Sequence, residues 1–339
     1  MKRLIALMAL ALLLAAPRAQ AQGDGAAGTA AADYLLLPMT ARSAALGTTL
    51  TGGLSDLSGV EAIQSNPAAL MTNTGTNAMF SRTNYVADIG INYFGVAQRL
   101  GNNNIALSVT AWDFGDIPLT SFGQPDPQGL TYGASTIVLT GTYARQFTDR
   151  ISAGLTAKVI NESIDDVSAS TVAFDAGMTY VVGESGLRFG VSLRNFGPKL
   201  TYGGNGLGRS VTFQNTDNTG FPVSIDAESF ELPSLLNFGA AYTRQFAEDL
   251  NFTVTGNFRS NSYNQDEYSG GLEVDFQRLV FLRGGIQIQE DMDATFYQGW
   301  NVGGGVNLDL SGTNVAVDYA YRGVDFFSSV NLISASITL

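Results

Sequence analysis

Two acidic clusters are the residues of this chain whose type and spacing could most directly do chemistry. Asp165 and Asp166 are adjacent, and Glu290, Asp291 and Asp293 form a second group. Carboxylates grouped in this way can act as general acid and base, or can bind calcium through their oxygens. Both clusters are expected in loops, with no histidine beside them and without the spacing of an EF-hand. We therefore interpret them as solvated loop residues and expect no catalytic residue and no metal site.

The chain contains no histidine and no cysteine. This excludes zinc sites built from these residues, disulfide bonds, and nucleophiles that depend on a cysteine or a histidine. We expect no cofactor and no enzymatic activity. Lys and Arg number 18 against 30 Asp and Glu, a formal net charge of −12. An acidic chain lacks the cationic surface that phosphate contacts need, so nucleic acid is not an expected partner.

The start of the chain has the three parts of a secretory signal peptide. A basic beginning is followed by an apolar run over 4–16 and by an A-x-A cleavage site that ends at Ala21. The apolar run is too short to span a bilayer as a helix. The sequence therefore predicts an exported protein from which residues 1–21 are removed.

Alternation with a period of two residues recurs through most of the remaining chain. Phe252 and Val254, for example, alternate with Asn251 and Thr253. Segments of about ten alternating residues are typical of transmembrane β-strands. Fourteen such segments are predicted, at 78–85, 88–98, 104–113, 135–146, 151–162, 170–181, 187–195, 235–245, 249–259, 267–276, 279–288, 299–308, 313–322 and 330–339.

The strand count and the links between strands favour a closed barrel. Short links alternate with longer ones, notably 114–134 and 196–234, as short periplasmic turns alternate with external loops in outer-membrane barrels. A secreted two-sheet sandwich is the alternative, but its polar face would carry more Lys and Glu. We predict an all-β fold: a transmembrane antiparallel β-barrel of about 14 strands over 78–339, preceded by an N-terminal plug or periplasmic segment over 22–77. Its predicted location is the lipid bilayer of the cell outer membrane.

Charged residues on these strands are expected to face the lumen, because Lys or Arg facing lipid at the bilayer centre costs about 2–4 kcal/mol. A tight turn centred on Arg278 places Glu273 directly opposite Arg283, and we predict an ion pair between them. The mixture of signs favours ion pairs that hold a filled lumen over a selectivity ring. Aromatic residues at strand ends, including Trp112 and Trp300, are expected at the membrane interfaces. The charged residues expected in the lumen are Asp113, Lys158, Asp175, Arg188, Arg194, Arg259, Glu273, Asp275, Arg283, Asp318 and Arg322.

The region before the strands does not alternate and carries motifs of its own. Residues 41–47 read A-R-S-A-A-L-G, and residues 66–70 read N-P-A-A-L. Later segments include D-F-G-D-I-P at 113–118 and G-V-S-L-R-N-F-G-P at 190–198. In this linked order the chain resembles the PorV/PorQ family of outer-membrane proteins, a branch of the FadL-like barrels.

Asn66, Pro67 and Ala68 match the family motif that precedes the first strand. Pro67 disfavours helical backbone at Asn66, and the Asn66 amide can bond to nearby backbone. We interpret these three residues as a structural turn.

The resemblance implies a non-enzymatic component of type IX secretion. Proteins of this kind bind the C-terminal domain of a secreted cargo at the translocon and shuttle it to a surface attachment complex. The implied partners are therefore translocon proteins, attachment-complex proteins and cargo C-terminal domains. The surfaces expected to contact them are the external loops, chiefly 114–134 and 196–234, and the candidate contact residues are Phe114, Asp116, Ile117 and Pro118.

The alternative function is a FadL-like outer-membrane channel for the uptake of hydrophobic small molecules, with 22–77 as its plug. Such a channel needs an apolar pocket that leads into the lumen. The residues expected in the lumen are small, polar and charged, which favours the secretion component over the channel.

Overall fold

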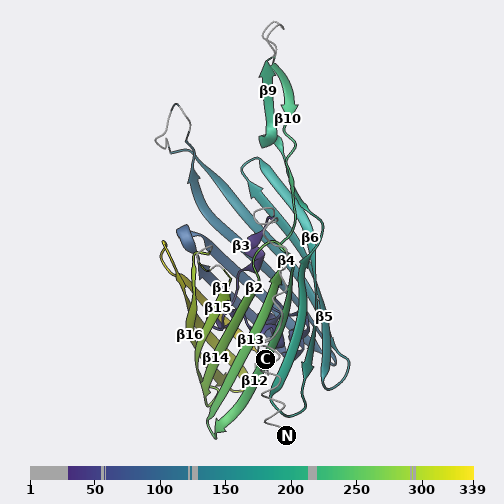
Figure 1. The fold of residues 1–339 in the computed structure, drawn as a ribbon, viewed down its shortest axis with the longest axis vertical. Coiled ribbons are helices and arrows are strands. Elements are labelled where there is room, and N and C mark those ends of the chain that lie inside the picture. The colour runs from purple at the N-terminus through teal and green to yellow at the C-terminus, as the bar shows by residue number, and fades with distance from the viewer. Residues whose placement is uncertain are drawn as a thin grey trace.

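Fourteen long strands form a closed antiparallel barrel, in chain order around the ring (Figure 1). The last strand pairs with the first, with Ala78 opposite Ile337, and this pairing closes the wall. The prediction of a 14-stranded barrel is confirmed. The strands are β1 (Thr76–Asn84), β2 (Gly90–Leu100), β3 (Asn103–Pro118), β4 (Thr131–Gln146), β5 (Ile151–Ile164), β6 (Val167–Val181), β7 (Leu187–Phe196), β12 (Leu235–Ala247), β13 (Leu250–Asn261), β14 (Glu267–Phe276), β15 (Val280–Gln289), β16 (Tyr297–Leu310), β17 (Thr313–Val324) and β18 (Val330–Thr338).

The structure is a computed structural model. The signal-peptide prediction for 1–21 lies outside the residues that it describes, as do Asp291 and Asp293 of the second acidic cluster. The described residues are 30–54, 57, 59–120, 123, 129–212, 220–290, 292 and 295–339.

Alternating side chains separate the two faces of the wall. Leu107, Leu155 and Leu282 point outward and are 69%, 63% and 66% exposed, whereas their polar neighbours point into the lumen. A belt of exposed apolar side chains around a closed barrel is the surface that meets lipid, so the fold is that of an outer-membrane β-barrel. Among the described residues, no helix is long and apolar enough to cross a membrane.

The two ends of the barrel differ. Tight connections such as 311–312, between β16 and β17, lie at what we call the short-turn end. At the opposite, long-loop end, the chain between β7 and β12 builds an arm. There β8 (Leu200–Gly203) pairs with β6 and with β11 (Ser229–Phe230). The hairpin of β9 (Gly208–Thr212) and β10 (Gly220–Ser224) rises above the barrel (Figure 1).

The residues expected in a partner-binding loop lie in a strand instead. Phe114, Asp116, Ile117 and Pro118 belong to β3, and Ile117 pairs with Tyr132 of β4. The expected loop start at 114 is therefore wrong. A register shift between Asp113 and Asp116 marks a bulge, and backbone pairing continues beyond it although the side-chain alternation does not.

The same end of β3 overturns two further expectations. Trp112 is 5% exposed and points into the lumen, so it is not an interface residue. Asp113, its neighbour, is exposed on the outer face and does not enter the lumen. Outside the hydrocarbon layer, an outward carboxylate meets water, so the rule that drives charges inward no longer applies there.

The described residues before β1, which are 30–54, 57 and 59–75, lie inside the barrel, and we call them the plug. It begins at the long-loop end, where Ala30 bridges to Glu231, and it reaches the short-turn end at β1. Its elements are short and largely buried. They are η1 (Asp33–Leu36), α2 (Ala41–Ala45), η2 (Leu50–Gly52), α3 (Gly59–Ala62) and η3 (Pro67–Thr72).

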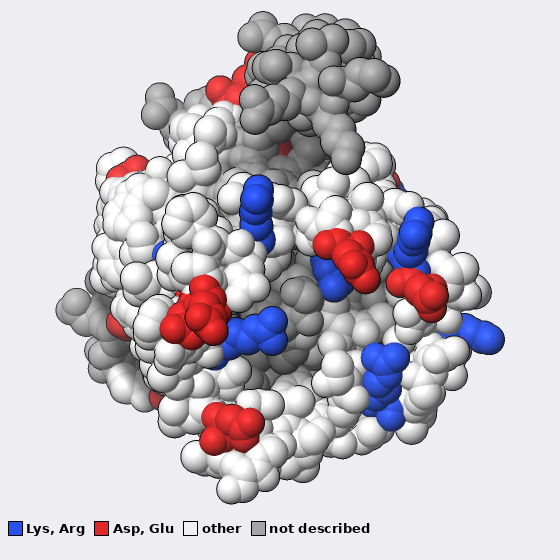
Figure 2. Space-filling model, turned by 90° about the horizontal axis from the view of Figure 1, so that it is seen from below, with Lys and Arg blue, Asp and Glu red and all other residues white. Residues whose placement is uncertain are grey.

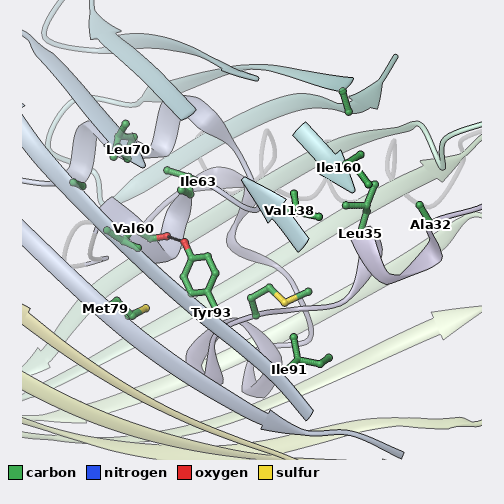
Figure 3. Close-up of a cluster of buried hydrophobic side chains, with 14 of the residues drawn as sticks. Ala32, Leu35, Val60, Ile63, Leu70, Met79, Ile91, Tyr93, Val138 and Ile160 are labelled. Atoms are coloured by element: carbon green, nitrogen blue, oxygen red, sulfur yellow. Dashed lines mark hydrogen bonds between the residues drawn. The ribbon is translucent and has the colours of Figure 1, made fainter. Parts of the chain in front are cut away.

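One side of the plug packs on the wall through apolar side chains. Leu35, Val60 and Ile63 of the plug lie among inward residues of β2, β4 and β5, and the Tyr93 hydroxyl donates to the Val60 carbonyl at 2.9 Å (Figure 3). Burying each of the larger side chains stabilises the packing by about 1.5–3 kcal/mol. This burial explains why so apolar a segment lies inside the barrel.

Glycines in the wall let the plug backbone approach closely. A Cβ at Gly190 of β7 would lie 2.0 Å from the Thr51 carbonyl oxygen, and one at Gly285 of β15 would lie 2.5 Å from the Gly47 nitrogen. No side chain fits at such distances. The chain has 39 glycines, and part of this high content is explained by wall positions where the plug backbone lies too close for a side chain.

Candidate functional site

A buried ionic network joins the plug to the wall. Arg42 of α2 donates two hydrogen bonds to Glu273 of β14, from Nη2 to Oε1 at 2.6 Å and from Nε to Oε2 at 2.8 Å. Arg283 of β15 donates from Nε to Glu273 and from Nη1 to Asp318 of β17. All four side chains are buried. Buried charges are tolerated when each has an opposite partner, and this arrangement provides one for each.

Glu273 and Arg283, the pair proposed from the strand register, are Cα partners across β14 and β15. The alternation predicts that Asp318 faces the lumen, but it does not predict which residue pairs with it. The role of Arg42 was not predicted from the sequence, because the plug has no strand periodicity that would assign this residue to a face. The available signal was an arginine within a run of small and apolar residues, since a buried arginine needs a carboxylate.

Beside this network, a cavity of about 700 Å³ lies at the short-turn end, and we call it the vestibule. Figure 2 shows this end of the barrel, with a central hollow and both signs of charge around it. Its rim includes the turn residues Gln277, Arg278 and Asp309. Its inner lining includes Arg42, Leu57, Glu61, Phe281, Arg283 and Asp318.

A second ionic cluster lies in the half of the lumen nearer the long-loop end. Lys158 Nζ lies 2.7 Å from Asp175 Oδ2 and 2.7 Å from Asn195 Oδ1. Arg194 is also buried here, and its Nη2 donates to the Leu35 carbonyl of the plug at 3.2 Å. The Arg194 hydrogen bond ties the upper part of the plug to β7.

Between the plug and the inward residues of β3, β4 and β5, little space remains. A cavity of only about 30 Å³ lies there, lined in part by Leu35, Met39, Trp112 and Val138. The Tyr34 ring packs against Trp112, with the ring centroids 4.7 Å apart. The space is close to that of one water molecule in the liquid. This cavity is therefore too small for an organic molecule.

Asn66 is the anchor of its motif. It is fully buried, its Oδ1 accepts from the Ala68 backbone N–H at 3.0 Å, and its Nδ2 donates to the Thr51 carbonyl at 2.8 Å and the Met178 carbonyl at 3.1 Å. Pro67 is the first residue of η3. The contacts bind η3, η2 and β6 together. These three motif residues thus hold the plug to the wall, with no free polar group aimed at a ligand.

The acidic cluster Asp165–Asp166 forms the tight turn between β5 and β6. Within the described part of the chain, no group of three or more carboxylate, cysteine or histidine side chains is placed to hold a metal ion. Of the residues once expected to meet partners, Asp116 and Pro118 are exposed, and Phe114 and Ile117 are partly buried.

Several solved structures are similar to the barrel. The toluene transporter TodX of Pseudomonas putida aligns with a TM-score of 0.56 and 13% identity, over 88% of this chain and 96% of its own. A FadL homologue of Pseudomonas aeruginosa gives 0.56 and 11%, over 88% and 98%. The monoaromatic hydrocarbon channel CymD gives 0.53 and 14%, over 89% and 97%. No protein-family model and no curated protein matches the sequence. At these identities, the likeness is one of fold.

Proposed function

We propose that the protein is a gated transporter of small apolar molecules in the outer membrane, with the plug as its gate. The observation that carries the proposal is the division of the lumen. A vestibule of about 700 Å³ lies at one end, and toward the other end the plug packs so closely on the wall that a cavity of only about 30 Å³ remains between them. The fold shared with a toluene transporter and a hydrocarbon channel supports an apolar substrate.

The contacts between the plug and the wall are compatible with a plug that moves as a gate. Its helical elements are each six residues or shorter, and glycines in the wall receive its backbone. Among the described residues, the plug contacts the wall through the Arg42–Glu273 ion pair, side-chain hydrogen bonds, the backbone bridge at Ala30 and apolar packing. A segment held in this way can shift without breaking the ladder of the wall.

A reversible disulfide lock tests the gate. The hydroxyls of Thr49 in the plug and Thr255 in β13 are 2.5 Å apart and buried, and the chain has no native cysteine. Thr49→Cys with Thr255→Cys therefore places two thiols within bonding reach. Uptake of radiolabelled toluene is measured in cells that carry the variant in the outer membrane. We expect oxidation to reduce uptake to the level of cells without the protein, and reduction to restore it.

A matched pair within the wall serves as the control. Thr142 and Thr156 face each other across β4 and β5, with their hydroxyls 2.8 Å apart and both side chains buried. A disulfide between cysteines at these positions leaves the plug free, so oxidation should not change uptake. Equal uptake by the locked and unlocked Thr49/Thr255 variant would refute the gate.

A secretion component like PorV is the second candidate, and the arm at the long-loop end favours it. The hairpin of β9 and β10 exposes Val211, Phe221 and Val223, which are 36%, 42% and 38% exposed, beyond the barrel. Exposed apolar residues on a protruding element are suited to protein contacts. The motif resemblance supports the same function.

Binding of a purified type IX cargo C-terminal domain distinguishes the two candidates. Replacing 205–225 by a short Gly-Ser link should abolish cargo binding if the second candidate is correct, and should leave toluene uptake unchanged. The Thr49/Thr255 disulfide should instead abolish toluene uptake and leave cargo binding unchanged. Failure of the intact protein to retain the cargo domain in a pull-down argues against the secretion candidate.

A further inference from the structure

Glu61 is a buried carboxyl group that the fold leaves only partly satisfied. It lies on α3, it is 4% exposed, and it lines the vestibule. Its Oε1 has no hydrogen-bond partner among the described residues. A buried carboxylate oxygen without a donor is unfavourable, so such a group either takes up a proton or meets a donor from elsewhere.

The groups around Glu61 leave an excess of negative charge. Arg42 and Arg283 both bond to Glu273, and Arg283 also bonds to Asp318. Together with Glu61, this gives three carboxyl groups against two guanidinium groups among the described members of the network. Tyr93 of β2 is close by, but its hydroxyl donates to the Val60 carbonyl and not to Glu61.

The pKa of Glu61 reflects this environment. It is raised to about 7, mainly by burial; Asp318 and Glu273 add to the rise, and Arg42 and Arg283 oppose it. Near neutral pH the group therefore exchanges readily between its acid and its carboxylate.

We propose that the vestibule binds a small organic monocation with an apolar body, whose ammonium group donates to the Glu61 carboxylate. The cationic group supplies both the missing donor and the missing positive charge. The lining is mostly polar, and Leu57 and Phe281 within it supply apolar contacts for the body of the ligand. A volume of about 700 Å³ lies in the range of small-molecule pockets. An organic cation is preferred to a metal ion because no metal-binding group of side chains is present in the described part of the chain.

A series of three probes of similar size and different charge tests the site. Phenethylamine is cationic, 2-phenylethanol is neutral and phenylacetate is anionic at pH 8. Their affinities for the full protein in detergent are measured by isothermal titration calorimetry. We expect phenethylamine to bind at least tenfold more tightly than 2-phenylethanol, and phenylacetate to bind more weakly than both. Equal affinities for the amine and the alcohol would overturn the proposal.

Variants locate the site. Glu61→Gln should remove the preference for the amine and leave the affinity for the alcohol unchanged. Asp309→Asn is the control, because it removes a carboxylate from the exposed rim, where water screens it. We expect it to change the preference less than twofold. A preference retained in Glu61→Gln would show that the amine binds elsewhere and would also overturn the proposal.

A pH titration of the native protein keeps the test independent of the variants. Between pH 8 and pH 6, Glu61 passes from mostly ionised to mostly protonated, since its pKa is about 7. The affinity for phenethylamine should then fall about tenfold, whereas that for the alcohol should not change. An amine affinity that does not depend on pH contradicts the assignment to Glu61. Because binding is measured at equilibrium on the closed barrel, its outcome does not depend on whether any molecule crosses.

Discussion

The plug meets two walls of the same barrel in different ways. The wall of β1–β6 supplies most of the apolar side chains that pack against the plug, although it also buries the Lys158–Asp175 ion pair, whereas the wall of β13–β17 supplies the ion pair to Arg42 of the plug and further buried charges. Apolar contact is non-directional and tolerates small shifts, but a buried ion pair fails if one partner is lost or if the register slips by one residue. We call β1–β6 the apolar wall and β13–β17 the charged wall. The apolar wall supplies most of the apolar burial of the plug, and the charged wall fixes the position of the plug. The contrasting residues are Met79, Tyr93, Trp112, Val138 and Ile160 on the first wall, and Arg259, Glu267, Glu273, Arg283 and Asp318 on the second.

The largest expected effect comes from removing the central cation of the charged wall. Among the described residues, Arg283→Met leaves Glu273 with Arg42 as its remaining ion-pair partner and Asp318 without its arginine. Loss of one partner of a buried network costs about 3–5 kcal/mol. We expect a decrease of this size in the free energy of unfolding, measured by urea denaturation of the protein folded into lipid vesicles.

Arg209→Met is the control for this substitution. Arg209 lies on the exposed β9 hairpin, where it bonds only to nearby carbonyls among the described residues. Its loss should change the free energy of unfolding by less than about 0.5 kcal/mol. Equal effects at the two positions would mean that the charged wall does not hold the plug.

The same substitution, glycine to alanine, should have different effects on the two walls. At Gly285 of β15, the new Cβ would meet plug backbone atoms, including the Gly47 nitrogen at 2.5 Å. At Gly95 of β2, it would meet the Val60 Cγ1 at the same 2.5 Å, but that atom ends a side chain. We expect Gly285→Ala to reduce the free energy of unfolding by about 3 kcal/mol and Gly95→Ala by about 1 kcal/mol.

The fluorescence of Trp112 reports where the plug sits in these variants. Trp300, the other tryptophan of the chain, points outward, so Trp300→Phe leaves Trp112 as the single reporter. Trp112 packs on Tyr34 of the plug. A red shift of its emission in Gly285→Ala, and none in Gly95→Ala, is the expected result. The same shift in both would show that the two walls constrain the plug equally.

The sequence predicts the wall well because lipid imposes a rule on every second residue. Alternation sets the faces of β14 and β15, and a tight turn then leaves one register, in which Glu273 meets Arg283. The plug obeys no such rule, so neither the role of Arg42 nor the position of Glu61 could be predicted. The rule also stops at the membrane surface, which is why the strand end at Trp112 and Asp113 was assigned to the wrong faces.

The smallest expected effect tests whether burial, and not charge alone, makes the second wall decisive. Glu231, at the long-loop end, accepts from the Tyr263 hydroxyl and lies 3.1 Å from Lys199 Nζ, and its backbone bonds to Ala31 at the start of the plug. Its side chain is exposed, and the Tyr263 hydrogen bond is the main cause that lowers its pKa. Because the folded pKa is lowered, the contribution to stability is present above the ordinary carboxyl pKa of about 4.3 and is lost as the pH falls through the lowered value.

Exposed ion pairs contribute little and are screened by salt. We therefore expect Glu231→Gln to lower the urea midpoint slightly at pH 7 in low salt, and not at all in about 1 M salt, where the Debye length is about 3 Å. Arg283→Met should keep most of its effect at the same salt concentration, because its partners are buried. If salt removed both effects equally, the charged wall would act through exposed electrostatics, and burial would not be what distinguishes it from the apolar wall.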